Sequence, residues 1–376
     1  MKRRTKFVIM TLLAVLVLVA LFLQADREEM EDLLENADLT IIALVILLYF
    51  LNMGAKVLRW YALLWSDGYH PPLGKVTLYF LIGMGVNNST PGRVSGEPVR
   101  AYLLKTGTDY PMGHGMASIF LEKTIDTIVT LCLAVIGLVL LIGVISTEAQ
   151  NTLFLSIGIV ALFMGAIILL LFYPKGLRRL SAWGFGHLRN RMDVKKVDGW
   201  EEKSKGFLGT FEVGTREIAS NRGATMAATG LTIVIWLNEA LRLWLIFLAL
   251  GYNISAEIVI VAVCLASFAS LLIPLGAGSS TAIAAICILS GVDSTLSTTA
   301  GLLFVMTSIW ISLPLGAAAM AISGVKAGDI LGDNTDEEEG RDRGDGASEA
   351  GTGDDAEARP LCVPDEEAVP GVPDAP

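Results

Sequence analysis

The segment from Gly83 to Arg100, GMGVNNSTPGRVSGEPVR, combines residue types that bind anions. Arg93 and Arg100 supply guanidinium groups, which form paired hydrogen bonds with phosphate or carboxylate oxygens. Ser95 is suited to cap a helix that has Glu97 in its first turn, and that helix would point its partly positive end at the same place. Because backbone N–H groups at a helix start bind phosphate readily, the segment predicts an anion site suited to phosphate.

The alternative for this segment is a plain turn at the cytoplasmic face. Its two arginines would then serve only to orient the chain in a membrane. A polar cluster that a plain turn does not need, from Asn87 to Thr90, lies beside them. We therefore favour a binding site and include Asn88 in it.

Two further pairs of ionisable residues lie within apolar sequence, where charge is costly and suggests function. Glu122 and Asp126 are four residues apart, so they share a helix face and need a cationic partner, which the arginines of the first segment could supply. Glu239 and Arg242 are three residues apart and can pair on one helix. The alternative for each pair is an ion pair that only holds helices together.

Arg59 follows a long apolar run and precedes Trp60. A long cationic side chain near a helix end can extend to the membrane surface, so the sequence predicts a structural role for Arg59.

The motifs of common enzyme classes are missing from the sequence. Its four cysteines form no CxxC pair and its three histidines no pair four residues apart, so neither a disulfide framework nor a zinc site is expected. It has neither a P-loop nor a dinucleotide-binding fingerprint. We expect no cofactor, no metal, no catalytic residue and no nucleic-acid partner, and we favour a protein that is not an enzyme.

Long apolar stretches must position these groups. The chain has 376 residues, of which 53% are hydrophobic and 18% charged, against about 25% charged in soluble proteins. A helix crossing a bilayer needs roughly 20 apolar residues. The sequence therefore predicts an all-α, polytopic transmembrane helical bundle in the cell membrane. Its expected crossings are 7–24, 39–65, 115–143, 152–173, 225–250 and 299–323.

The distribution of positive charge predicts the orientation of these crossings, because short cytoplasmic loops are rich in Lys and Arg. The first crossing follows MKRRTK and precedes no signal-cleavage motif, so we expect a retained helix and a cytoplasmic N-terminus. The region 173–222 has eleven Lys and Arg against six acids, so it is expected inside, as is the C-terminus. Two apolar regions, 78–104 and 257–292, must then each enter and leave on one side.

Both of these regions are broken. The segment from Gly83 to Arg100 contains four glycines and two prolines, too many helix breakers for one continuous helix. The second region is broken by the sequence IPLGAGSST at 273–281, which includes Gly276 and Gly278. Our topology has the first broken hairpin entering from inside and the second from outside. Two interrupted segments with opposite entry indicate an inverted-repeat transporter with a site at mid-depth. Two unrelated kinks are the alternative, because Gly and Pro are common in membrane helices.

The domain organisation follows from charge. Residues 1–326 form the expected transmembrane domain, with a basic cytoplasmic segment at 174–222 that is either an interfacial helix on an anionic leaflet or a loop that enforces topology. Residues 327–376 contain sixteen acids against three arginines and little apolar sequence, so we expect a disordered acidic tail.

The run TPGRVSGEPVRAYLL at 90–104 resembles the signature of the flippase-like family, which includes UPF0104-type proteins and the membrane domain of lysylphosphatidylglycerol synthases. The stretch from Leu121 through Asp126 is similar to the acidic-basic-acidic motif that follows in that family, and Arg59-Trp60 is similar to its early helix motif. The resemblance covers roughly residues 5–325; its first motif is fairly specific, and the others are weak alone.

The resemblance implies a polytopic helical fold that moves or handles an anionic lipid. Some archaeal relatives carry a glycosyltransferase domain and are linked to polyprenyl-phosphate sugars. The sequence departs from the family where Ser279 follows Gly278, because the family's second break usually ends with an acid. The tail is too short and polar for a transferase domain, so lysyl transfer itself is not expected.

We therefore predict a flippase, or a transporter of an anionic or polyprenyl-phosphate-linked lipid. The guanidinium groups of the first segment would hold the phosphate, Glu122 and Asp126 would position them or couple to protons, and Glu239 with Arg242 would form a gate or second contact. The alternatives are a membrane enzyme or subunit that acts with a separate transferase, with polar residues at one membrane face, and a structural scaffold. The predicted substrate-binding residues are Asn88, Arg93, Ser95, Glu97, Arg100, Glu122, Asp126, Glu239, Arg242, Gly276 and Gly278.

Overall fold

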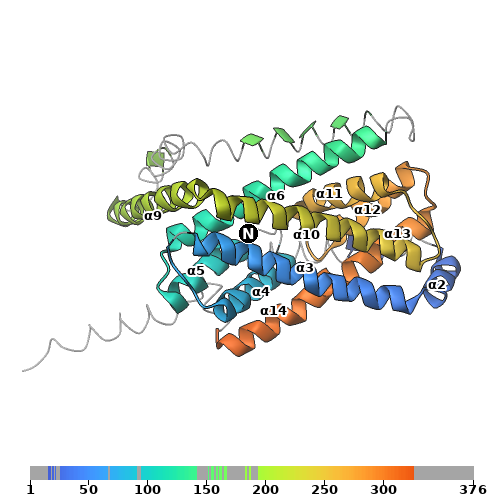
Figure 1. The fold of residues 1–376 in the computed structure, drawn as a ribbon, viewed down its shortest axis with the longest axis horizontal. Helices are drawn as coiled ribbons and strands as arrows, with labels where there is room; N and C mark the ends of the chain where they lie inside the picture. Colours follow the sequence, from blue (N-terminus) through green and yellow to red (C-terminus); the bar gives the residue numbers. More distant parts are fainter. Residues whose placement is uncertain are drawn as a thin grey trace, which may run out of the picture. The chain divides into compact units, whose positions relative to one another are not determined.

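The computed structural model describes residues 26–66, 68–90, 95–141 and 194–325, with scattered residues within 16–22 and 151–187. The regular structure of these residues is helical (Figure 1). The all-α prediction is thus confirmed. The helices are α2 (Arg27–Glu35), α3 (Leu39–Trp65), α4 (Leu73–Ser89), α5 (Gly96–Thr108), α6 (Met112–Leu140), α9 (Val194–Ser220), α10 (Arg222–Ala249), α11 (Ala256–Leu272), α12 (Ala277–Leu289), α13 (Ser294–Met306) and α14 (Ile309–Ser323).

Three helical stretches of the described chain are long and apolar enough to cross a membrane: α3, α10 and the stretch Ser294–Ser323 that contains α13 and α14. The bounds of α3 are those predicted, because Asp38 caps it by accepting a hydrogen bond from the Thr40 N–H at 2.8 Å. The expected crossings 7–24 and 152–173, the predicted interfacial helix and the acidic tail lie wholly or mostly outside the described residues.

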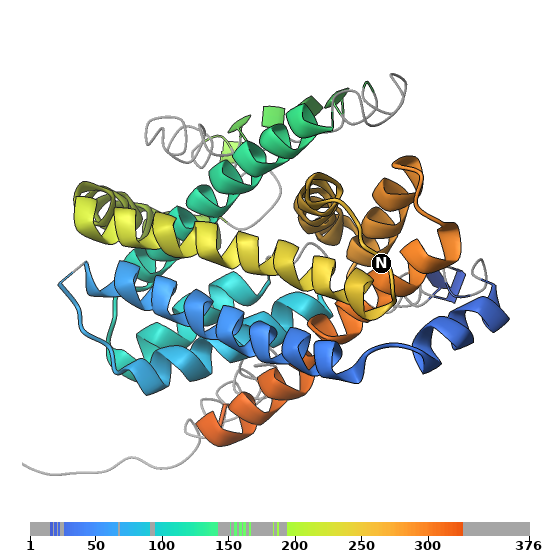
Figure 2. The same cartoon turned by 45° about the vertical axis from the view of Figure 1, so that its right-hand side comes forward.

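Helices α3 and α10 form an antiparallel pair, and they run side by side in both views (Figures 1 and 2). The Asp38 N–H donates to the Ala249 carbonyl at 3.0 Å, which ties the start of α3 to the end of α10. Farther along, the Asn52 side chain donates to the Ile235 carbonyl at 3.1 Å and to Asn238 Oδ1 at 3.0 Å. Polar contacts therefore hold this pair together within its apolar surroundings.

Both predicted broken hairpins are present, and they open toward opposite ends of the bundle. The first, α4 with α5, opens where α3 ends, since the Lys75 ammonium donates to the Gly107 carbonyl at 2.6 Å and Tyr110 donates to the Leu64 carbonyl at 3.5 Å. The second, α11 with α12, opens at the other end, because α11 starts a few residues after α10 finishes. This agrees with the opposite entry predicted from the charge pattern.

The two breaks meet inside the bundle. The Leu275 N–H, in the second break, donates to the carbonyl of Asn88 near the end of α4, at 3.3 Å. The Asn88 side chain also donates to Ser312 Oγ in α14 at 2.5 Å. Leu275 and Gly276 both have a left-handed backbone, with φ of 59° and 86°, which glycine adopts far more readily than leucine.

Glycines allow the close helix crossings that bring these breaks together. A Cβ on Gly278 would lie 2.3 Å from the Ala269 carbonyl oxygen, and one on Gly276 would lie 2.2 Å from Val305 Cγ1. Where α4 crosses α14, a Cβ on Gly316 would lie 2.8 Å from Gly85 Cα. Gly276 and Gly278 therefore shape the backbone, which is a different role from the substrate contact predicted for them.

The crossing predicted at 299–323 lies within the apolar stretch Ser294–Ser323, but it is not one continuous helix. The chain forms two helices, α13 and α14, separated by a turn at Thr307 and Ser308. The turn contains neither Gly nor Pro; the proline of this stretch, Pro314, lies inside α14. The structure thus contains a third helix interruption. The side chain of Arg242 donates a hydrogen bond to the Thr307 carbonyl in this turn.

Candidate functional site: a charged cavity between the helices

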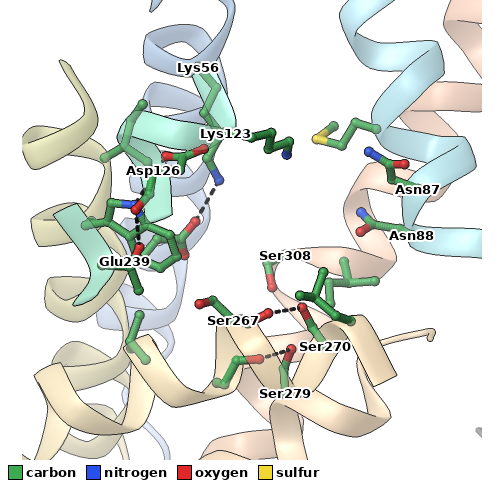
Figure 3. A pocket seen from close by; sticks show the side chains of 18 of the residues that line it. Lys56, Asn87, Asn88, Lys123, Asp126, Glu239, Ser267, Ser270, Ser279 and Ser308 are labelled. Carbon is green, nitrogen blue, oxygen red and sulfur yellow. Dashed lines mark hydrogen bonds and ion pairs between the residues drawn. The ribbon is translucent and has the colours of Figure 1, made fainter. Parts of the chain in front are cut away.

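A cavity of about 300 Å³ lies inside the bundle, where the two broken hairpins meet α3, α6, α10 and the start of α14 (Figure 3). Its charged lining residues are Lys56, Arg59, Glu97, Arg100, Glu122, Lys123, Asp126 and Glu239. Its amide and hydroxyl lining residues are Asn87, Asn88, Thr127, Thr130, Ser267, Ser270, Ser279 and Ser308.

Charged, amide and hydroxyl groups come to the cavity from different helices. Figure 3 shows Lys56, Asp126 and Glu239 on one side and the amides of Asn87 and Asn88 across from them. Serine side chains from α11, α12 and the start of α14 lie below both groups in this view. A ligand in the cavity would meet both charged groups and neutral hydrogen-bonding groups.

A first cluster of charged side chains consists of Glu97, Arg100, Glu122 and Lys123, and Glu97 bonds two of the others. Its Oε2 accepts a bond from Arg100 Nη1 at 3.0 Å, and its Oε1 accepts bonds from Asn87 Nδ2 and Lys123 Nζ, each at 3.0 Å. Arg100 also donates to Glu122 Oε2 at 2.8 Å. The predicted pairing of Glu122 with an arginine of the first segment is therefore present in the structure.

The guanidinium of Arg100 is fixed by packing as well as by ion pairs. Its Cζ lies 4.1 Å from the ring centroid of Trp60 and 4.8 Å from that of Phe80. Room for its side chain comes from Gly83, where a Cβ would lie 2.3 Å from Arg100 Cγ. Such cation–π contacts stabilise a desolvated cation, so Arg100 is a rigid part of the wall.

The structural role that the sequence predicted for Arg59, with its head at the membrane surface, is wrong in placement. Its side chain is 3% exposed and forms ion pairs with Glu122 at 2.7 Å and Asp126 at 2.5 Å. It also donates to Thr232 Oγ1 at 3.0 Å. Asp126 thus has Arg59 as its cation, and it accepts a further bond from the indole N–H of Trp236 at 3.3 Å.

A second cluster surrounds Glu239. As predicted, Glu239 pairs with Arg242 one turn later, at 2.8 Å, and its other oxygen accepts a bond from Lys56 at 2.9 Å. Arg242 is fully buried, 5.0 Å from the ring centroid of Tyr49 and 5.1 Å from that of Phe304. Arg242 also donates to the Thr307 carbonyl at 3.1 Å, which satisfies the interruption between α13 and α14.

The other predicted site residues are placed as follows. Asn88, Glu97, Arg100, Glu122, Asp126 and Glu239 all line the cavity. Arg93 lies outside the described residues. The described residues that line the cavity do not include Ser95, Arg242, Gly276 or Gly278. Arg242 reaches the site through Glu239.

The capping role predicted for Ser95 is wrong. Ser95 precedes α5, but within the described part of the chain its side chain forms no capping hydrogen bond. Asn87 performs this role from α4, because its Oδ1 accepts the Gly96 N–H at 2.7 Å. The amide of Asn87 therefore joins the end of α4, the start of α5 and Glu97.

We expect Asn87→Ala to lower the free energy of unfolding by about 1–2 kcal/mol, because it removes a helix cap. Ser95→Ala is expected to change it by less than about 0.5 kcal/mol, as for an ordinary surface change. Thermal unfolding of both variants in detergent tests this. A larger loss for the serine variant would contradict the assignment.

Sequence reasoning missed Lys56, Arg59 and Lys123 as parts of the site. A signal was present for two of them: Lys56 and Arg59 are three residues apart in an otherwise apolar helix, so they share a face. Charges on one face of a membrane helix indicate a polar interior. The serines of α11 gave a weaker signal, because serine is common in membrane helices.

These features define a polytopic helical membrane protein with a charged site in its interior. The family model of the lysylphosphatidylglycerol synthase TM region matches residues 7–316. The chain belongs to that family.

Several curated archaeal proteins are similar to the chain. A UPF0104 membrane protein of Methanothermobacter thermautotrophicus is 28% identical over 338 residues, which cover 87% of this chain and 98% of that protein. UPF0104 membrane protein PH1989 of Pyrococcus horikoshii is 25% identical over 83% of this chain and 95% of its own length. Glycosyltransferase AglD of Haloferax volcanii is 25% identical over 69% of this chain but only 43% of AglD. No solved structure matches the chain significantly.

Proposed function

We propose that this chain moves an anionic lipid, or a lipid-linked phosphate, across the membrane and binds its headgroup phosphate in the cavity. One observation carries the proposal: two broken hairpins that open toward opposite ends meet at a charged cavity. Transporters with inverted repeats bind substrate between such interrupted segments near mid-depth. The two hairpins would supply the alternating access that transport requires.

The charge of the described clusters favours an anion. Four cations and four carboxylates line the cavity, and the fully buried Arg242, which lies behind Glu239, adds one positive charge to these clusters. The cations are Lys56, Arg59, Arg100, Lys123 and Arg242, and the carboxylates are Glu97, Glu122, Asp126 and Glu239. Charge-assisted hydrogen bonds to phosphate are about twice as strong as neutral ones. The amides and serines would add neutral donors.

The depth of these charges opposes the scaffold alternative. Glu122 lies ten residues from the start of α6, and Glu239 lies ten residues from the end of α10. At 1.5 Å per residue each is about 15 Å from the nearer helix end. A structural scaffold needs no charge at that depth, where it is costly.

The test is transbilayer movement of fluorescent phosphatidylglycerol in vesicles that contain the purified chain, followed by dithionite quenching of the outer leaflet. Ser267→Trp places an indole at the cavity wall, whereas Leu272→Trp, on the same helix, points away because Leu272 is 74% exposed. We expect wild type and Leu272→Trp to move the lipid, and Ser267→Trp to lose most of this activity.

Size-exclusion profiles and melting temperatures of the two tryptophan variants serve as the control for folding. Movement equal to that of empty vesicles for wild type would contradict the proposal. An equal loss of lipid movement in folded Ser267→Trp and folded Leu272→Trp would also contradict it.

A second candidate function is a membrane component that acts with a separate glycosyltransferase. Its support is the similarity to glycosyltransferase AglD, of which this chain matches only part. It predicts that the purified chain moves no lipid and that a glycolipid forms only when a transferase is co-expressed. The vesicle assay therefore separates the two candidates.

A further inference from the structure

A Glu-x-x-Arg unit occurs twice around the cavity. In α5 it is Glu97 with Arg100, and in α10 it is Glu239 with Arg242; both pairs are spaced i, i+3 and bonded at 3.0 and 2.8 Å. In each unit the glutamate also bonds a lysine from a different helix. The two units therefore share one arrangement, in which a carboxylate bonds both an arginine of its own helix and a lysine of another helix.

The two cations of each unit differ in freedom. Arg100 and Arg242 are 3% and 0% exposed, and each packs against two aromatic rings. Lys123 is 50% exposed and Lys56 28% exposed, and both line the cavity. The arginines are therefore fixed partners, whereas the lysines can turn away from their glutamates without moving a packed ring.

We propose that Lys56 and Lys123 are the residues that bind the substrate phosphate, each moving from its glutamate to a phosphate oxygen. This inference rests on the proposed function. It replaces the arginines with the lysines as the direct contacts. Glu97 and Glu239 act as holders that keep the lysines in place while the cavity is empty.

The second cation of each unit lowers the energetic cost of this exchange. Removing the one partner of a buried carboxylate is costly, because an uncompensated charge remains. When Lys123 leaves Glu97, however, Arg100 and Asn87 still donate to that carboxylate. When Lys56 leaves Glu239, Arg242 remains. The exchange therefore leaves no buried carboxylate unpaired.

The chemistry of lysine suits this exchange. An ammonium has three donors on a flexible stem, so it can follow a moving phosphate, whereas a stacked guanidinium is held in one orientation. Lys56 comes from α3 and Lys123 from α6. A phosphate between them would accept hydrogen bonds from two different helices. Both lysine side chains line the cavity shown in Figure 3.

The experiment compares Lys56→Gln, Lys123→Gln and the double variant with Lys56→Arg and Lys123→Arg, which keep the charge. Lys105→Gln is the control, since Lys105 is an exposed lysine on α5 that does not line the cavity. Native mass spectrometry of the full chain in detergent measures binding of dioleoyl phosphatidylglycerol and phosphatidylcholine. The vesicle assay measures movement.

We expect each lysine-to-glutamine change to weaken phosphatidylglycerol binding about tenfold, as for loss of one charge-assisted hydrogen bond. The double variant should lose the preference for phosphatidylglycerol over phosphatidylcholine, and the arginine variants should keep much of it. Melting temperatures should stay close to wild type. A purely structural role would lower the melting temperature and leave lipid preference unchanged, which would overturn the proposal.

The outcomes separate this inference from the proposed function. Unchanged movement and preference in the double variant, with an active wild type, would overturn the lysine assignment alone. Lysine-dependent binding without movement would support the assignment and overturn transport. Absence of both binding preference and movement in wild type would overturn both. Competition by inorganic phosphate at equal concentration would assign the lysines to a soluble phosphate and overturn the lipid headgroup.

Discussion

Arg59→Leu is expected to lower the free energy of unfolding by about 3–5 kcal/mol, the usual cost of removing one partner from a buried ion pair. Arg59 bonds both Glu122 and Asp126 and is almost fully buried. After the change, Asp126 would retain only the Trp236 indole among the described partners that bond its side chain. An unpaired buried carboxylate is far costlier than an unpaired hydroxyl or amide.

Thermal unfolding in detergent, followed by size-exclusion chromatography, measures this effect. Arg216→Leu is the matched control, because Arg216 is exposed on α9 and should change stability little. Adding Asp126→Asn to Arg59→Leu should restore part of the loss, since the orphaned carboxylate charge disappears while Glu122 keeps Arg100 as its partner. If Arg59→Leu melts like Arg216→Leu, the buried network does not stabilise the fold as we infer.

Gly96→Ala is expected to destabilise the chain by about 3 kcal/mol, at the upper end of the range for overpacking. A Cβ at this position would lie 1.9 Å from the Gly83 carbonyl oxygen and 2.8 Å from Asn87 Oδ1. The nearer atom belongs to the backbone, so no side-chain rotation relieves the clash. Helix α5 would have to move away from α4 and carry Arg100 with it.

The control for this prediction is Gly54→Ala in α3. Among the described residues, no atom other than those of the adjoining residues and the backbone of α3 lies within 4 Å of the Cβ that the change would add. An alanine in a helix interior is more stable than glycine by about 0.5–1 kcal/mol, so this variant should melt slightly higher than wild type. Equal melting temperatures for the two alanine variants would show that α4 and α5 do not pack as closely as described.

The broken hairpins could be predicted from sequence because glycine and proline are local signals. Pro91, Pro98 and Pro274, with the glycines around them, interrupt apolar runs in a way that few other residues can. The start of α3 could also be predicted from sequence, because Asp38 precedes the apolar run and aspartate is a good N-cap residue. The helix breaks and the helix cap each depend only on residues that are close together in the sequence, so no knowledge of tertiary contacts is needed to predict them.

The partner of each charge could not be predicted, because it depends on which helices touch. Arg59 follows an apolar run and precedes an aromatic residue, which is also the pattern of a side chain that reaches the membrane surface. Its burial comes from α6 and α10, whose relevant residues lie 63 to 173 positions later. The turn at Thr307 gave no local signal, since its carbonyl is satisfied by Arg242 from another helix.

The ion pairs of the cavity also constrain how the chain is made. Arg59 in α3 has its carboxylates in α6, and Lys56 has its carboxylate in α10, 183 positions later. During synthesis α3 therefore enters the lipid before any of these partners exists. Each unpaired charge then costs up to about 2.5–3.5 kcal/mol, which is the cost at the centre of a helix during translocon-mediated insertion. The other, mostly apolar residues of α3 must offset this cost. The arrival of α10 completes the set, so the order of helix delivery at the ribosome determines when this protein can become stable.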